Sequence, residues 1–234
     1  MSIEFLCFKM YLCYNLNVNY VNTKLGGKYM KDLKEIFEER RSINFFDKNK
    51  DLDEETLKKI IDLGVLTPSA FNLQPWEIIA VKSKEAKEKL YDVALKQPKI
   101  LEAPVTLIMI GDKNGYKEDN PAWWYMKDVG MPDDKIQGSI DFAKNVLYNT
   151  DLKANNFAVR NTSLLCMSIM YAAKYYGVDS HAMIGFEEDK LKEAFGIPEN
   201  KVVVLLISLG YFDESKTLYP RLKRNGYDKI VKVV

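Results

Sequence analysis

Two adjacent arginines and a serine, Arg40, Arg41 and Ser42, form a segment that could bind a phosphate group. A guanidinium is planar and carries several N–H donors, so it grips phosphate oxygens in a way that a lysine ammonium does not. The segment directly follows a helical pattern, where arginines can instead complement the negative end of the helix dipole. Alone, the pattern favours that structural role, and a second basic segment nearby would be needed to favour phosphate.

A second candidate segment runs from Thr67 to Trp76 and is rich in turn-forming residues. Its small residues let a ligand approach the backbone, while Ser69, Asn72 and Gln74 can hydrogen-bond a polyol or the edge of a heterocycle. The alternative is a helix-to-strand connection in which Trp76 fills the core. Because prolines and hydrogen-bonding side chains crowd one short loop, the ligand-binding interpretation is favoured.

A third candidate is the basic stretch Tyr219 to Arg224, which contains Arg221, Lys223 and Arg224. A solvated basic patch is the ordinary explanation for such a stretch. If the chain folds back beside Arg40, however, the combined charges could neutralise a phosphate dianion.

The small number of histidines and cysteines limits the kinds of catalytic or metal site that the chain can form. The sequence has one histidine, His181, and three cysteines without a CxxC spacing, which argues against a zinc site and any His-based metal site. A Ser-His-Asp or Cys-His mechanism would have to use His181, and no nucleophile motif accompanies it. We therefore expect a cofactor to carry any redox or transfer chemistry, in a reducing, cytoplasmic environment.

Length and composition are those of a single packed domain. The chain has 234 residues, of which 47% are hydrophobic and 29% charged, so it can bury a full core. A formal net charge of +1 argues against a nucleic-acid partner bound through a basic surface. The longest apolar run, Val202 to Leu209, is far shorter than the roughly 20 residues that cross a bilayer, so no membrane partner is expected.

Hydrophobic periodicity and capping residues predict one α+β domain without internal repeats. Helices are expected over residues 30–40, 53–66, 83–95, 133–148, 152–176 and 187–195. Strands are expected over residues 76–81, 105–111, 178–183 and 202–209, the last being the most apolar and therefore central. Residues 112–132 are expected to be irregular. Asp53 and Ser83 are the predicted N-caps of their helices.

The first 29 residues raise a separate question. The residues Lys24 to Tyr29, directly before Met30, resemble the translation of a ribosome-binding site in an untranslated leader. The tripeptide Leu-Gly-Gly, for example, can be encoded by the purine-rich sequence TTAGGAGGT. We therefore expect the native start at Met30, with residues 1–29 derived from the leader; the alternative is a genuine extension that packs on the surface or is disordered.

From Met30 onwards the chain resembles the flavin-dependent nitroreductase family. The resemblance rests on several short motifs in the family's order and spacing: RRSxxxFD after the first helix, PSAxNxQPW before the first strand, Ala103-Pro104-Val105, the helix end 171–178, the turn Met183-Ile184-Gly185-Phe186 and a basic C-terminal arm. Their arrangement over some 200 residues is specific. It implies a nitroreductase-like fold, with a central, mainly antiparallel sheet flanked by helices, in residues 30–234.

The resemblance also implies an intertwined homodimer with two FMN sites at its interface. The FMN-binding positions that it indicates are Arg40, Arg41, Ser42, Asn44, Pro68, Ser69, Ala70, Asn72, Gln74, Gln97, Lys99, Ile184, Gly185, Arg221, Lys223 and Arg224. The first three would hold phosphate and ribityl, joined by Arg221 and Lys223, or by Arg224 in a shifted register. Pro68, Ser69 and Asn72 would come from the partner subunit. Lys99 would lie near the flavin pyrimidine edge, and Ile184–Gly185 near flavin N5.

The family's chemistry sets the expected activity. Hydride would pass from NAD(P)H to FMN, and a nitroaromatic, quinone or similar small electron-poor acceptor would then take two electrons at the same position, a ping-pong scheme. Trp123 and Trp124 would either stack over substrate or pack in the core. The alternatives on the same motifs are flavin binding without turnover, reductive dehalogenation and flavin fragmentation.

Two departures from the family pattern concern charge at the flavin. Asn44 replaces a basic residue that is common in the family, so positive charge near the reduced flavin would be either missing or supplied by Lys99 alone. Ile184 stands where some relatives have glutamate, which removes one means of steering the nicotinamide.

Overall fold

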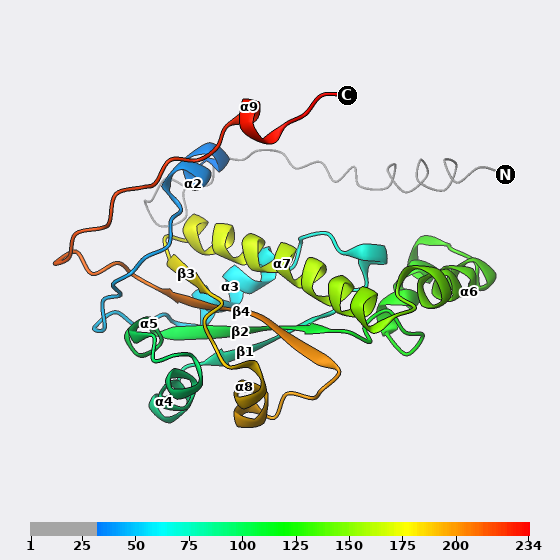
Figure 1. Ribbon diagram of the computed structural model, residues 1–234, viewed down its shortest axis with the longest axis horizontal. Coiled ribbons are helices and arrows are strands. Elements are labelled where there is room, and N and C mark those ends of the chain that lie inside the picture. The colour runs from blue at the N-terminus through cyan, green and yellow to red at the C-terminus, as the bar shows by residue number, and fades with distance from the viewer. Residues whose placement is uncertain (1–31) are drawn as a thin grey trace. The chain divides into compact units, whose positions relative to one another are not determined.

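The computed structural model describes residues 32–234. The expectation about residues 1–29, and the predicted helix start at Met30, lie outside these residues. Within the described chain, the predicted α+β class is confirmed by four strands with helices packed on both faces of the sheet (Figure 1).

The sheet has the strand order β1-β2-β4-β3, and every neighbouring pair is antiparallel. The strands are β1 (Trp76–Val81), β2 (Val105–Asp112), β3 (Asp179–Met183) and β4 (Lys201–Gly210). β2 is buried from Val105 to Gly111, as a strand covered on both faces should be. The prediction of a central last strand is confirmed, because β4 pairs with both β2 and β3.

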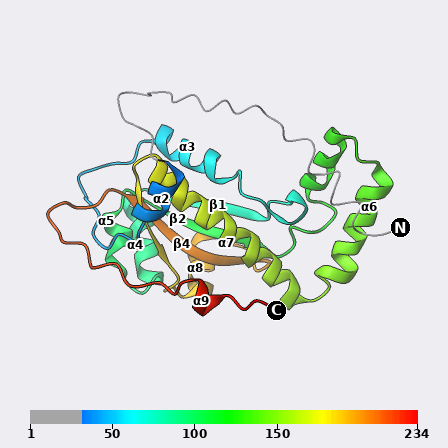
Figure 2. The ribbon, with the colours of Figure 1, turned by 90° about the horizontal axis from the view of Figure 1, so that it is seen from above.

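One face of the sheet is covered by α7 (Asp151–Tyr175) and α3 (Glu54–Gly64). Figure 2 shows α7 crossing the strands. Alternate side chains of β2 and β4, including Leu107 and Ile207, pack against Leu165 and Ile169 of α7. The buried Cys166 belongs to this core, and burial raises the pKa of its thiol to about 12.

The opposite face is covered by three shorter helices, α4 (Lys84–Val93), α5 (Pro98–Glu102) and α8 (Glu188–Phe195). Their buried side chains, Leu90, Ile100 and Leu191, meet the other alternate residues of the sheet. α5 is not among the predicted helices, although Pro98 at its first turn is a typical start signal.

A further cluster lies at the N-terminal end of α7. It consists of η3 (Pro121–Val129), α6 (Asp133–Phe142) and the π-helical turn η4 (Ala143–Leu147). The prediction that residues 112–132 are irregular is wrong for η3, which is a 3-10 helix capped by Asn120. Residues 133–148 are helical as predicted, apart from the π-turn.

Side-chain caps explain several helix starts. Asp53 accepts a hydrogen bond from the Thr56 N–H, and Ser83 accepts one from Ala86, which confirms both predicted N-caps. α2 (Leu33–Glu39) begins with a capping box between Asp32 and Glu35. Two short helices complete the fold, η2 (Ala70–Asn72) and α9 (Tyr227–Ile230).

Residues 32–234 contain neither a membrane-spanning helix nor a cluster of metal-binding side chains. No helix in this range is long and apolar enough to cross a membrane. In the same range, no three His, Cys, Asp or Glu side chains gather in a group that could hold a metal ion.

Candidate functional site

The arginine segment lies where α2 ends and the chain becomes extended. Arg40 is the C-cap of α2, and its N–H still donates to the Ile36 carbonyl. Beyond it, Ile43 and Phe46 are each 2% exposed and pack with Ala103. These two apolar anchors fix the segment, while Arg40 and Arg41 stay half-buried beside it.

The C-terminal arm returns to this segment, so the first and third candidate segments meet. The Asp47 N–H donates to the Tyr211 carbonyl (2.8 Å) and Phe46 pairs with Phe212, which aligns the arm with the segment. Further along, Arg221 Nη2 donates to the Arg40 carbonyl (3.1 Å), and Arg41 Nη2 donates to the Tyr219 carbonyl. We call Arg40, Arg41 and Arg221 the arginine corner.

The other two basic candidates of the arm, Lys223 and Arg224, lie apart from that contact. Lys223 and Arg224 are exposed, and the Arg224 guanidinium donates to the carbonyl of Leu222. Of the three basic candidates in the arm, Arg221 is therefore the one that the structure joins to Arg40.

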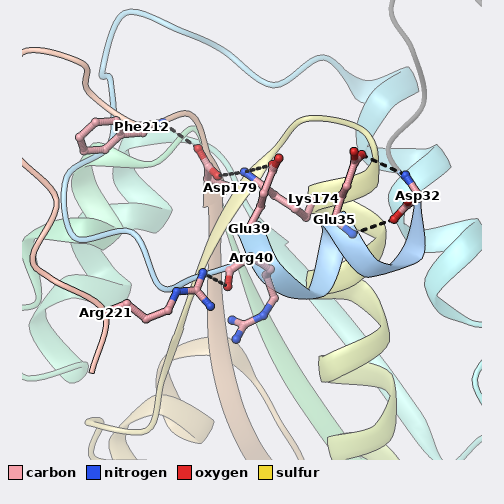
Figure 3. A network of polar contacts seen from close by, with 8 residues as sticks. All are labelled: Asp32, Glu35, Glu39, Arg40, Lys174, Asp179, Phe212 and Arg221. Atoms are coloured by element: carbon pink, nitrogen blue, oxygen red, sulfur yellow. Dashed lines mark hydrogen bonds and ion pairs between the residues drawn. The ribbon is translucent and has the colours of Figure 1, made fainter. Parts of the chain in front are cut away.

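A half-buried ion pair ties together the elements that carry the arginine corner (Figure 3). Asp179, at the start of β3, accepts from Lys174 Nζ (3.1 Å) and from the Phe212 N–H (3.2 Å). Lys174 also pairs with Glu39 at the end of α2 (3.9 Å). The Lys174 and Asp179 side chains are both only 18% exposed, so the pair is shielded from solvent. The ends of α2 and α7, the start of β3 and the arm are thus connected at one point.

Two donors of the arginine corner lack a protein acceptor. Within the described chain, Arg40 Nε and Arg41 Nε are buried and have no hydrogen-bond partner. Leaving such a donor unsatisfied costs about 1 to 3 kcal/mol, and buried polar groups of this kind call for an explanation. An anion with several acceptor oxygens would satisfy them, so the residues present fit a phosphate group.

Other predicted site residues lie next to the arginine segment. The Ile43 N–H donates to the Ser180 carbonyl (3.1 Å), and Ser42 pairs with Ser180, so the segment runs along β3. After β3, the Gly185 carbonyl accepts from Gln97 Nε2 (2.8 Å). Ile184, 80% exposed, leaves this turn open to solvent.

His181 of β3 contacts the arginine segment through Ile43. The sequence indicated no role for this histidine. Its Nδ1 lies 2.7 Å from the Ile43 carbonyl oxygen. Burial, together with the positive charge of Lys99, lowers the pKa of His181 to about 4, against the opposing effect of the Ile43 hydrogen bond. The imidazole is therefore neutral at pH 7. Because a carbonyl only accepts, Nδ1 carries the proton.

We expect this imidazole to make the protein acid-sensitive. Between about pH 6.5 and pH 4 the unfolded chain binds a proton at His181 that the folded chain does not, so stability falls as pH falls. After allowance for its partial exposure, the loss is about 1 to 2 kcal/mol. Urea denaturation at pH 7 and pH 4.5 should show a smaller acid loss for His181→Asn than for the wild type. An equal loss would contradict the assignment, since His181 is the chain's single histidine.

The second candidate loop has an unusual backbone. Phe71, Asn72 and Gln74 all have positive φ angles, of 53°, 56° and 48°, which residues other than glycine seldom adopt. Strain of this kind persists only where surrounding contacts hold it, and it concentrates at binding sites. Here Ser69 Oγ accepts from the Gln74 N–H (3.0 Å). Pro68 and Asn72 remain exposed and can contact a ligand.

Asn161 of α7 holds this loop, and the sequence analysis missed it. Its Oδ1 accepts from the Ala70 N–H (2.8 Å), and its Nδ2 donates to the Phe157 carbonyl (2.7 Å). The side chain is almost fully buried. A buried amide on an otherwise apolar helix face was the signal that could have identified it.

Replacing Asn161 with alanine should leave the half-buried Ala70 N–H without its acceptor. We expect a loss of about 2 kcal/mol in the free energy of unfolding, with faster amide exchange in residues 69–74. Urea denaturation and hydrogen exchange measure the two effects. Asn149→Ala, which removes an exposed amide bonded to the Asn145 carbonyl, is the control. Equal effects of the two substitutions would argue against this role.

Within one chain, the loop and the arginine corner do not meet. Ala70 is bonded to Asn161, whereas the Arg40 guanidinium lies 6.0 Å from the ring of Tyr171. Ten residues of helix separate these points on α7, or about 15 Å along its axis. The described chain therefore presents two separate groups of candidate residues.

Trp123 occupies the core position and not the substrate position of the two that were expected. It is fully buried, and its indole N–H donates to the carbonyls of Tyr116 and Lys117. The centre of its ring lies 5.1 Å from that of Phe71, so Trp123 packs against the loop. Trp124 is half-buried, with the Lys127 ammonium 4.7 Å from its ring.

Comparison with known proteins gives one consistent result. Residues 37–211 match the model of the nitroreductase family. The Bacillus subtilis proteins YodC and MhqN, both named as NAD(P)H nitroreductases, are 31% and 30% identical to the chain, covering 77% and 86% of it. These alignments span 90% of YodC and 97% of MhqN.

Solved structures agree over the same region. A Bacillus subtilis nitroreductase structure, ydfN, is 28% identical with a TM-score of 0.79, covering 86% of this chain and 98% of its own. A nitroreductase from Exiguobacterium sibiricum 255-15, solved in complex with FMN, is 25% identical with a TM-score of 0.76, covering 86% and 97%. The sheet order and helical layers described above are thus shared along almost the whole length of both structures.

Proposed function

Since this chain belongs to the nitroreductase family, we propose that it is an FMN-dependent oxidoreductase that uses NAD(P)H to reduce nitroaromatics, quinones or similar electron-poor acceptors. One observation carries the proposal: Arg40, Arg41 and Arg221 meet in the folded chain and leave two buried Nε donors without an acceptor among the residues that the structure describes. The phosphate of FMN supplies such acceptors. The FMN bound in the Exiguobacterium structure and the names of the Bacillus relatives support the cofactor and the nucleotide.

The residues around the arginine corner fit the rest of FMN. Ser42 is exposed directly after the two arginines and can hydrogen-bond the ribityl chain. Lys99 lies close enough to His181 to lower its pKa, so its positive charge is beside the same segment. When bound, FMN would supply the two-electron chemistry that a ping-pong reaction between a nicotinamide and an acceptor requires.

The chain's own contribution is to bind and to orient. The arginine corner holds the phosphate, and the Lys99 ammonium stabilises negative charge near the ring. Gln97 fixes the Gly185 carbonyl, which keeps the backbone of the Ile184 turn in place. Asn44 brings no charge, and the His181 imidazole is neutral at pH 7. Lys99 and the arginines therefore provide the positive charge that stabilises the cofactor's negative charge.

We also propose that residues 30–234 form the FMN-binding domain and that two copies assemble into a homodimer. The domain includes the family-matched residues 37–211 and adds the arm that carries Arg221. Apolar side chains left exposed on one chain, among them Phe37 of α2, Leu164 of α7 and Leu222 of the arm, support the dimer. Burying them between two copies would remove apolar surface from water.

The arm should contribute to FMN binding through Arg221 alone. Arg221→Ala is expected to weaken FMN binding about 5-fold, because one exposed charge-assisted contact is lost. Lys223→Ala and Arg224→Ala should change the affinity less than 2-fold, as neither side chain reaches Arg40. Quenching of FMN fluorescence during titration measures all three. A larger effect of either neighbour than of Arg221 would show that the arm binds in a shifted register.

The activity itself is tested on the purified protein. We expect a yellow protein whose released chromophore is FMN, and NADH or NADPH oxidation that depends on an added quinone or nitroaromatic. Initial rates at varied concentrations of both substrates should give parallel double-reciprocal lines. If neither nucleotide reduces the bound flavin under anaerobic conditions, the protein is a flavin binder without turnover. If no flavin binds, the proposal fails.

A further inference from the structure

The phosphate-binding segment pairs with the edge strand of the sheet over residues 42–43. β3 is the last strand in the order β1-β2-β4-β3, and residues 42–43 run beside it. The backbone bond from the Ile43 N–H to the Ser180 carbonyl (3.1 Å) is made there, next to the Ser42–Ser180 bridge. A pairing this short cannot fix the position of two long arginine side chains by itself.

His181 supplies the second half of the attachment. Side chains alternate along a strand, so His181 lies on the same face of β3 as Met183, toward α5 and α8. From there its Nδ1–H donates to the Ile43 carbonyl (2.7 Å). Ile43, which is 2% exposed, thus has its N–H bonded to Ser180 and its C=O bonded to His181.

We propose that His181 is a positioning residue for the cofactor: it clamps Ile43 to β3 and so holds Arg40 and Arg41 where they can bind the FMN phosphate. The residue itself touches the segment and not the phosphate. This role rests on the proposed function in so far as the bound group is FMN. The clamp itself is a property of the chain and can be measured without any ligand.

The position of the clamp explains why it matters. Arg41 precedes Ile43 by two residues, and the Ile184 turn follows His181 by three residues. The phosphate end and the turn near the flavin ring are therefore linked through the bonds that Ile43 makes with Ser180 and His181. Without the donor, the buried Ile43 carbonyl loses its partner, and the segment gains freedom that FMN binding must remove again.

Asparagine and leucine at position 181 have similar shapes, so comparing them separates the effect of the lost hydrogen-bond donor from the effect of changed packing. Asparagine places an amide N–H close to the position of imidazole Nδ1, whereas leucine has the same branching but no donor. We expect His181→Leu to weaken FMN binding about 5- to 10-fold and to speed exchange of the Ile43 amide in the FMN-free protein. His181→Asn should restore both quantities to near the wild-type values. Amides of β4 should exchange at unchanged rates in both variants.

Each outcome decides the question. Leucine and asparagine variants with equally weakened FMN binding would show that ring volume matters and donation does not. A leucine variant with wild-type affinity and exchange would overturn the clamp. Should His181→Leu fail to fold, ¹⁵N shifts of the wild-type imidazole remain decisive: we expect protonated Nδ1 at pH 7, and a proton on Nε2 alone would overturn the proposal. Failure of the wild type to bind FMN would refute the proposed function but leave the exchange and tautomer results to judge the clamp.

Discussion

Replacing Arg40 with alanine should lower the affinity for FMN by about 10- to 150-fold. A charge-assisted hydrogen bond to a phosphate contributes about 1.5 to 3 kcal/mol, and the guanidinium of Arg40 has a buried Nε donor that no group of residues 32–234 satisfies. The fold should survive, because the backbone carbonyl of Arg40, not its side chain, accepts from Arg221. Titration of the flavin-free variant with FMN, followed by fluorescence quenching, measures the change.

Two control variants test the cause of that loss. Arg40→Lys keeps the charge but loses the planar fork, so it should recover only part of the affinity. Lys190→Ala removes an exposed positive charge from α8, where it pairs with Glu187, and should leave FMN binding unchanged. If folded Arg40→Ala binds FMN as tightly as the wild type, the phosphate does not lie at the arginine corner.

Local sequence signals were sufficient to predict those features that depend on contacts between residues close together in the chain. Asp53 and Ser83 cap their helices through the N–H three residues later, and such pairs can be recognised from spacing alone. The strand from Trp76 to Val81 has the predicted bounds, since punctuation on both sides marks its ends. The short helix α5 was not predicted, because five residues are too few to show a periodic pattern.

The candidate site depended on contacts that no local pattern encodes. Arg41 and the Tyr219 carbonyl are 178 residues apart in the chain, and only the folded arm brings them together. The motif resemblance indicated Arg221 without deciding between it and its basic neighbours, and the contact with Arg40 favours Arg221. Asn161 and His181 were missed as supporting residues because their partners, Ala70 and Ile43, are distant in sequence.

The geometry of a single chain raises the question of how one FMN meets both candidate groups. The loop at Asn72 and the arginine corner contact α7 about 15 Å apart, and each group is open to solvent. In a symmetric dimer, the loop of one subunit can lie against the corner of its partner, which gives two equal sites. The exposed apolar residues of α2, α7 and the arm are consistent with such an interface.

Mixing two defective chains should therefore restore a site. Arg40→Ala and Asn72→Ala homodimers should both bind FMN poorly, because every site carries one lesion. A heterodimer of the two would have one site with both lesions and one with neither, if the residues come from different subunits. Co-refolded and tag-purified heterodimers should then bind about half a flavin per chain with wild-type affinity. Heterodimers without any high-affinity site would place Arg40 and Asn72 in the same subunit's site, since each site would then retain one lesion.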